Sequence, residues 1–236
     1  MICNLFIFRH AETTDNSSHI FSGWRDPDLT AKGLLQAHEI AQQLEYEKID
    51  YAFTSHLLRA KRTLEIVLKT HAKVPVFMDD RLIERCYGKL QGKSKIEVEA
   101  ERPEWFAQVH RDYDFPPPEG ESLRMVESRT LPFVDLLEGW LRQNPGNVAI
   151  SCHGNSMRPI RRVFEHLSLK QMLQLENPQD QAMEYALHIH RINVDKVEER
   201  KPETDWHSLV GSVVCKIGDR PKKPIKAVLL SLTKLF

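Results

Sequence analysis

Several side chains that could carry out chemistry together stand at or just after segments with the apolar pattern of buried strands. Arg9 and His10 end the run LFIF, and His153 follows the run VAIS. Arg59 comes soon after YAFTS, and Glu84 comes soon after VPVFM. Ligands of open α/β sheets gather beyond the carboxyl ends of the parallel strands. We therefore expect these side chains to meet at one edge of a sheet.

Histidines, arginines and a carboxylate in one place suit phosphoryl transfer. A neutral imidazole can attack phosphorus and carry the group as a covalent phosphohistidine, which splits one transfer into two. The transition state spreads negative charge over three oxygens, and arginines can stabilise that charge without a metal. A carboxylic acid can protonate the leaving oxygen. Each residue alone is a weak signal, so the prediction depends on their combination from separate segments.

Short β-rich runs alternate with helical patterns along most of the chain. Strands are expected at Cys3–Phe8, Asp50–Thr54, Val74–Met78, Asn147–Ser151 and Tyr185–Ile192. Helical spacing predicts helices over residues 30–44, with Thr30 as N-cap, over 56–69, and over 122–140, with Ser122 as N-cap. The alternation predicts an α/β fold with a mostly parallel central sheet and helices on both faces, followed by a C-terminal extension.

The end of the chain differs in composition from the rest. We expect a catalytic domain over residues 1–194 and a basic, amphipathic extension over 195–236. Six cations and one anion lie between Lys216 and Phe236. An amphipathic helix is expected there from the apolar residues Ile225, Val228, Leu229, Leu232 and Leu235. Docking of this extension on its own domain is favoured over a subunit contact or a membrane-surface helix.

The overall composition is that of an ordinary globular protein. The chain has 33 Lys+Arg and 33 Asp+Glu among 236 residues, so its formal charge is zero and nothing suggests a nucleic-acid partner. The four cysteines form no CxxC pair, which argues against a zinc site or a disulfide framework and favours the cytoplasm. No signal peptide and no apolar stretch long enough to span a membrane are evident.

The motifs around the candidate residues resemble the histidine phosphatase superfamily, and within it the cofactor-dependent phosphoglycerate mutases. The similarity runs from about residue 4 to residue 187. FRHAETTDN resembles the nucleophile loop, with His10 in the phosphorylated position and Arg9 beside it. SHLLRAKRTLEI supplies a second phosphate-binding arginine, Arg59, and ERCYGKLQGKSK supplies the presumed acid, Glu84. CHGNSMRPI supplies the second histidine, His153.

The resemblance also implies a set of substrate-binding residues. They are Asn16, Ser22, Gly23, Tyr87, Lys95, His110, Arg111, Gly154 and Asn155. His110 stands where the family usually has arginine, so one cation of the substrate site is either missing or pH-dependent. The sequence NPQD at 177–180 replaces the family's usual Pro-Thr-Gly turn.

The resemblance implies interconversion of 3-phosphoglycerate and 2-phosphoglycerate, a step of glycolysis and gluconeogenesis, through a phosphohistidine on His10. 2,3-Bisphosphoglycerate is the implied primer, no metal is implied, and a homo-oligomer is left open. A phosphomonoesterase that uses the same phosphohistidine is the alternative, favoured by His110 and the NPQD turn and disfavoured by Tyr87, Lys95 and Arg111. A non-catalytic phospholigand-binding protein would be expected to have lost one of the reacting residues, and none is lost.

Overall fold

A six-stranded sheet organises the computed structural model of this chain, which describes residues 1–189 and 225–229. Its strands are β1 (Ile2–Arg9), β2 (Tyr51–Thr54), β3 (Val76–Met78), β4 (Val148–Cys152), β5 (Ala182–His188) and β6 (Ile225–Leu229). They lie in the order β3-β2-β4-β1-β5-β6. β1, β2, β3 and β4 run parallel, whereas β5 pairs antiparallel with β1 and parallel with β6. The predicted α/β fold with a mostly parallel sheet is confirmed.

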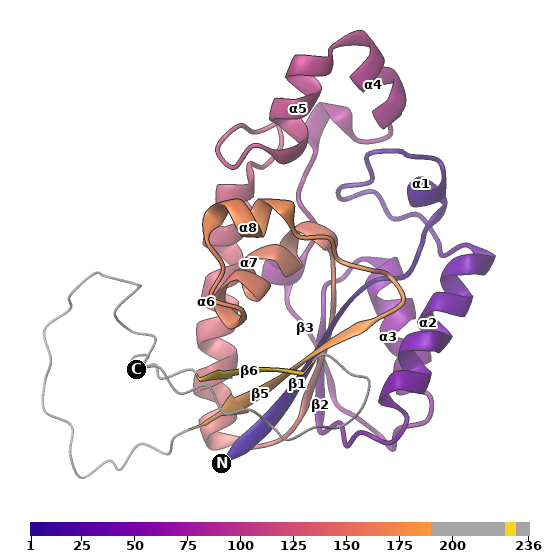
Figure 1. Ribbon diagram of the computed structural model, residues 1–236. Helices are drawn as coiled ribbons and strands as arrows, with labels where there is room; N and C mark the ends of the chain where they lie inside the picture. Colours follow the sequence, from indigo (N-terminus) through magenta and orange to yellow (C-terminus); the bar gives the residue numbers. More distant parts are fainter. Residues whose placement is uncertain (190–224, 230–236) are drawn as a thin grey trace, which may run out of the picture.

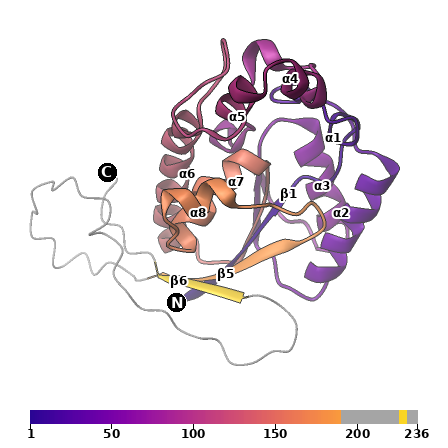
Figure 2. The ribbon, with the colours of Figure 1, turned by 45° about the horizontal axis from the view of Figure 1, so that its top comes forward.

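Helices cover both faces of this sheet (Figures 1 and 2). They are α1 (Thr14–Ser17), α2 (Ala31–Leu44), α3 (Leu58–Leu68), α4 (Lys95–Glu101), α5 (Pro103–Arg111), α6 (Leu123–Gln143), α7 (Gly154–Phe164) and α8 (Leu169–Gln174). α2 and α3 lie on one face, and α6 and α7 lie on the other. α4 and α5 lie beyond the carboxyl ends of the parallel strands and form a cap.

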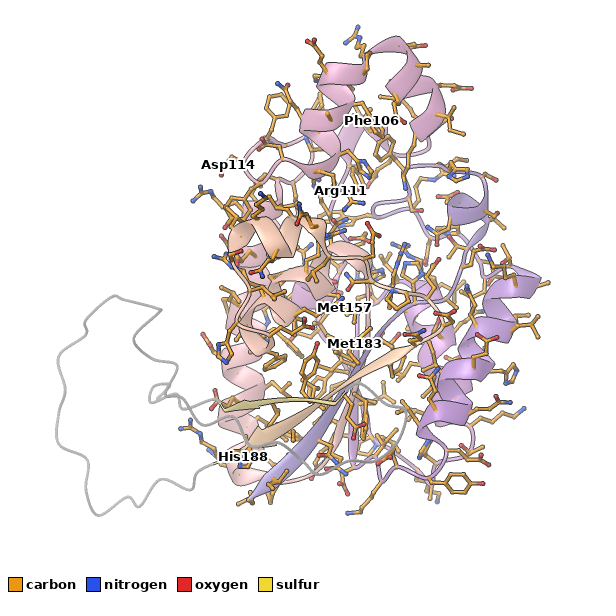
Figure 3. The ribbon with its side chains drawn as sticks, in the orientation of Figure 1. Phe106, Arg111, Asp114, Met157, Met183 and His188 are labelled. Atoms are coloured by element: carbon orange, nitrogen blue, oxygen red, sulfur yellow. The ribbon has the colours of Figure 1, made fainter. Side chains whose placement is uncertain are left out.

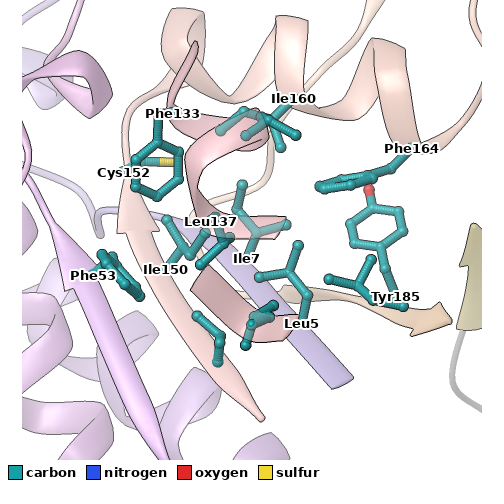
Figure 4. Close-up of a cluster of buried hydrophobic side chains, with 14 of the residues drawn as sticks. Leu5, Ile7, Phe53, Phe133, Leu137, Ile150, Cys152, Ile160, Phe164 and Tyr185 are labelled. Carbon is teal, nitrogen blue, oxygen red and sulfur yellow. The ribbon is translucent and has the colours of Figure 1, made fainter. Parts of the chain in front are cut away.

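Strand β1 shows why the sequence favours two covered faces. Leu5 and Ile7 point into the apolar cluster under α6 and α7, part of which is drawn in Figure 4. Phe6 and Phe8 point into the cluster under α2 and α3. All four side chains are fully buried. A strand buried on both sides needs a continuous apolar run, and β1 has one up to the residue where the pocket begins.

The helix starts follow the predicted caps. The Thr30 hydroxyl accepts a hydrogen bond from the Gly33 amide at 2.9 Å, and the Ser122 hydroxyl accepts one from the Met125 amide at 3.2 Å. α6 continues through Pro132 to Gln143. Among the residues that the structure describes, no helix is long and apolar enough to cross a bilayer.

The predicted amphipathic helix near the C-terminus is wrong where the structure describes it. Ile225–Leu229 form strand β6, which pairs with Glu184–His188 of β5. A short apolar run fits a strand as well as a helix, and the backbone edge of β5 offers hydrogen-bonding partners that the sequence pattern does not reveal. The expected domain boundary at 194/195 and the residues after 229 lie outside the described residues.

Candidate active site

A cavity of about 310 Å³ opens where β1 and β4 end, under the α4–α5 cap. All but one of the predicted site residues line it: Arg9, His10, Asn16, Ser22, Gly23, Arg59, Glu84, Tyr87, Lys95, His110, Arg111, Gly154 and Asn155. The remaining residue, His153, is fully buried with its ring centroid 5.1 Å from that of His10. The structure therefore brings the predicted residues together.

The hydrogen bonds of His10 fix which ring nitrogen can react. Nδ1 lies 2.8 Å from the backbone oxygen of Ala11, which can only accept, so Nδ1 carries the hydrogen. Nε2 accepts a hydrogen bond from Nε of Arg59 at 3.2 Å. In this tautomer Nε2 carries the lone pair that nucleophilic attack requires, and the guanidinium of Arg59 is beside it.

Arg59 is held from several sides in a fully buried position. Its Nη1 donates to the carbonyl oxygen of Arg25 at 2.7 Å, and its Nη2 donates to that of Gly23 at 2.8 Å. Gly23 has a φ of +53°, and a Cβ there would lie 2.2 Å from Oε1 of Gln91. The positive φ favours glycine in this turn, and a side chain here would also have to displace Gln91; the turn presents its carbonyl to Arg59.

Arg9 provides a second cation at the same end of the cavity. Its Nη1 donates to the backbone oxygen of Asn177 at 3.3 Å, while its buried Nε has no partner among the described residues. Burial lowers the pKa of Arg9, and burial lowers that of Arg59 to about 10. Both groups stay cationic at neutral pH, so an oxyanion is the natural partner for this end.

The two histidines are neutral at neutral pH. Burial, and after it the charge of Arg59, lowers the pKa of both His10 and His153 well below the ordinary value of 6.5. Nε2 of His153 lies 2.7 Å from the hydroxyl of Ser55, while its Nδ1 is buried without a partner in the described part of the chain. A neutral imidazole keeps the lone pair that attack on phosphorus needs.

Glu84 lies between the end of β4 and the cap. Its Oε1 accepts hydrogen bonds from the amides of Arg85 at 2.7 Å and Asn155 at 3.2 Å. Asn155 is in the first turn of α7, so a helix N-terminus fixes the carboxylate. The amide of Asn155 at the start of α7 is therefore paired with Glu84. The carboxyl group lies near His10, as a proton donor to the leaving oxygen must.

Residues of the α4–α5 cap and of α7 line the cavity on the side away from β1; we call this side, with Lys95, Arg111 and Arg158, the far end. The Asn155 side-chain amide donates to the hydroxyl of Tyr87 at 3.2 Å. The ammonium of Lys95, the first residue of α4, lies 5.6 Å from the ring of Phe21. Arg111, the last residue of α5, donates to the backbone oxygen of Leu173 at 3.2 Å. Figure 3 shows Arg111 between the cap and α8, so this end has cations of its own.

His110 does not supply a further cation at neutral pH. Its ring packs 4.9 Å from that of Phe106 and 6.2 Å from that of Phe21. Burial, and then the charges of Arg111 and Lys95, lower its pKa to about 4. The cation that the sequence left open as missing or pH-dependent is therefore missing at pH 7.

The structure also brings residues to the cavity that the sequence did not indicate. His19, Arg158 and Glu176 line it, and Nε2 of Gln179 donates to the carbonyl of His10 at 3.2 Å and to Oδ1 of Asn16 at 3.0 Å. Arg158 had a usable signal, since it follows Gly154 by four residues and so shares its face of α7. Gln179 lies in the NPQD turn that the sequence analysis singled out. His19 and Glu176 had no signal, because nothing in their local pattern places them near β1.

His10, Glu84 and His153 also satisfy the spacing of a metal site, since one ligand atom of each lies within 4.8 Å of the others. It is the one such cluster found among the described residues. The charges of Arg9 and Arg59 beside the histidines disfavour a further cation there. Metal independence remains a prediction.

Comparison with known proteins agrees with this geometry. The model of the histidine phosphatase superfamily (branch 1) matches residues 5–198. The chain belongs to the histidine phosphatase superfamily. It is 40% identical over 182 residues to a 2,3-bisphosphoglycerate-dependent phosphoglycerate mutase of Nitrobacter winogradskyi, covering 73% of this chain and 86% of the relative.

Solved structures of the superfamily share the fold. A putative α-ribazole-5'-P phosphatase from Escherichia coli matches with a TM-score of 0.70 and 23% identity, covering 79% of this chain and 91% of that one. A phosphoglycerate mutase from Bacillus anthracis matches with a TM-score of 0.66 and 19% identity, covering 78% and 87%. Mutases and phosphatases thus have the same architecture, and the side chains of the cavity have to decide between them.

Proposed function

We propose that this enzyme is a phosphoglycerate mutase that interconverts 3-phosphoglycerate and 2-phosphoglycerate through a phosphohistidine on His10. The observation that carries the proposal is the charge at both ends of one cavity. Arg9 and Arg59 flank His10, and Lys95 and Arg111 line the far end. A substrate with a phosphate and a carboxylate needs cations at two separate places. The 40% identity to relatives named as mutases supports the same activity.

In the proposed reaction Nε2 of His10 attacks phosphorus, and the P–O bond to the substrate oxygen breaks. Arg9 and Arg59 stabilise the charge on the transferring group, and Glu84 protonates the oxygen that leaves. His10 would first be loaded in this way from the primer. Loaded His10 then gives its phosphoryl group to the free hydroxyl of 3-phosphoglycerate, with Glu84 as the base. It next takes the other phosphoryl group of the bisphosphate so formed, so that 2-phosphoglycerate leaves and His10 is phosphorylated again. His153, neutral and 5.1 Å from the His10 ring, would donate a hydrogen bond to the transferring group.

The residues present fit 2,3-bisphosphoglycerate as the primer. Buried Nε of Arg9 and Nδ1 of His153 lack partners among the described residues, and the cations of the cap suit a second anionic group. Arg9, Arg59 and His153 would hold one phosphate, and Lys95 and Arg111 the other. When bound, this compound would supply the phosphoryl group that first loads His10. We propose the cytoplasm as the location, as expected for an enzyme of glycolysis.

A phosphomonoesterase is the second candidate, and two features of the cavity favour it. His110 is uncharged at pH 7, and the carboxylate of Glu176 lies among the cations of the far end. Both features reduce the attraction for a substrate carboxylate. Water would then be the acceptor of the phosphoryl group from His10.

The test is to supply 3-phosphoglycerate with a trace of 2,3-bisphosphoglycerate and to follow 2-phosphoglycerate and free phosphate together. A mutase makes 2-phosphoglycerate far faster than phosphate, and the rate depends on the primer. The His10→Ala variant is the blank and should lose at least about 10³-fold of either activity. Phosphate release without isomerisation would replace the mutase by the phosphatase.

A further inference from the structure

The carboxylate of Glu176 lies on the wall of the cavity, next to Arg111, one of the predicted substrate-binding residues. Its Oε1 accepts a hydrogen bond from Nη2 of Arg111 at 2.8 Å. Arg111 is also tied through Nη1 to the backbone oxygen of Leu173, so its position does not depend on Glu176 alone. Glu176 is therefore already paired with Arg111, the cation that the carboxylate of the proposed substrate would need.

Other cations also surround Glu176. Burial opposes ionisation of Glu176, but the hydrogen bond and charge of Arg111, followed by the charges of Arg158 and Arg9, lower its pKa below the ordinary value. Arg158 is itself nearly buried, and its Nη1 donates to the carbonyl oxygens of Met172 and Leu173. Glu176 is thus a counterion for Arg111 and Arg158.

We propose that Glu176 is a specificity-determining residue that competes with the carboxylate of the substrate for Arg111. This inference rests on the proposed function and deepens it. Ligands with a second anionic group must displace Glu176, whereas a phosphate monoester without one binds at the His10 end and leaves it in place. Glu176 thereby reduces the difference in affinity between ligands that carry a carboxylate and phosphate monoesters that do not.

The exposure of the ion pair sets the size of this effect. The Glu176 side chain is 77% exposed and that of Arg111 is 41% exposed, so Glu176 can turn out to solvent. Exposed ion pairs contribute little, and a single one corresponds to a change of at most about fivefold in an equilibrium. Glu176 should therefore adjust substrate preference without excluding a carboxylate.

The experiment compares the affinities of two ligands for the full-length protein and its Glu176→Gln variant. Calorimetry without primer measures 3-phosphoglycerate and glycerol 3-phosphate, which differ in the carboxylate, and an assay for free phosphate verifies that each ligand stays intact. Glutamine keeps the acceptor oxygen for Arg111 and removes only the charge. Asp114→Asn is the matched control, because Asp114 pairs with Arg124 on the surface and does not line the cavity.

We expect Glu176→Gln to tighten 3-phosphoglycerate about three- to fivefold more than glycerol 3-phosphate, and Asp114→Asn to change neither. Equal tightening of both ligands would mean a general charge effect and would overturn the inference. Weaker binding of 3-phosphoglycerate, or no measurable binding of it to either protein, would also overturn it. The proposed function is tested separately, by the formation of 2-phosphoglycerate. If that assay fails, the affinities of the two ligands can still be compared between the two proteins.

Discussion

The two ends of the cavity are built by different means. At the His10 end, Arg59 is fully buried and two backbone carbonyls and a ring nitrogen hold its guanidinium. At the far end, Arg111 is 41% exposed and shares an ion pair with the flexible side chain of Glu176. The residues proposed to react are thus positioned by buried strand ends, whereas the residues proposed to select the substrate are partly exposed.

A scaffold built in this way would allow one fold to serve both mutases and phosphatases. Changing the His10 end disturbs the core, because its residues continue the buried strands β1 and β4. Changing the far end alters the surface of the cap and of the loop after α8. Substitutions should therefore have their largest effects on activity at the His10 end and smaller effects at the far end.

The largest effect below the loss of His10 is expected for Glu84→Gln. Glutamine retains an oxygen to accept from the amides of Arg85 and Asn155, but it cannot give up a proton to the leaving oxygen. We expect kcat to fall about 10²- to 10⁴-fold with little change in substrate affinity. Steady-state kinetics and calorimetry measure the two quantities. An unchanged kcat would remove Glu84 from the mechanism.

A substitution at the far end should act on affinity instead. Lys95→Gln removes a cation of the cavity while keeping a polar residue at the start of α4. We expect the KM for 3-phosphoglycerate to rise about tenfold more than the KM for p-nitrophenyl phosphate, which has no second anionic group. A similar rise of KM for both substrates would mean that Lys95 binds the phosphate near His10, and would contradict its assignment to the far end.

The neutral histidines make stability depend on pH. His10 and His153 have folded-state pKa values well below 6.5, so below about pH 6.5 the unfolded chain binds more protons than the folded one. The free energy of unfolding should therefore fall as the pH drops from 7 to 5. The fall is shallow near pH 7 and, well below pH 6.5, approaches roughly 1 kcal/mol per pH unit for each histidine. Urea unfolding at several pH values measures this, and His153→Asn should flatten the profile. A profile that rises toward acid pH would contradict the neutral assignment.

The smallest effect is expected for His110→Phe. Phenylalanine keeps the packing against Phe21 and Phe106 and removes the titratable nitrogen atoms. Since His110 is already uncharged at pH 7, the KM for 3-phosphoglycerate should change less than about threefold. A tenfold rise at pH 7, measured against wild type, would show that the imidazole binds the substrate.

The same contrast separates what the sequence could predict from what it could not. His10 and His153 follow apolar strands directly, so the parallel sheet alone brings them together. Glu176 and His19 reach the cavity only through the return of a loop after α8 and after α1, and no periodicity encodes that path. The apolar pattern predicts a helix where β6 forms, because a run as short as five residues fits both the helical and the strand period.

Several positive charges lie around one cavity, so the stability of the folded state should depend on the concentration of small anions that bind there. Folding brings the cations of Arg9, Arg59, Arg111 and Arg158 to a single hollow, and an anion that binds there stabilises the native chain by mass action. At one hundred times its dissociation constant, such a ligand adds about 2.7 kcal/mol. The lifetime of this protein in a cell should therefore follow the level of phosphorylated metabolites, so that the enzyme persists longest when its substrate is abundant.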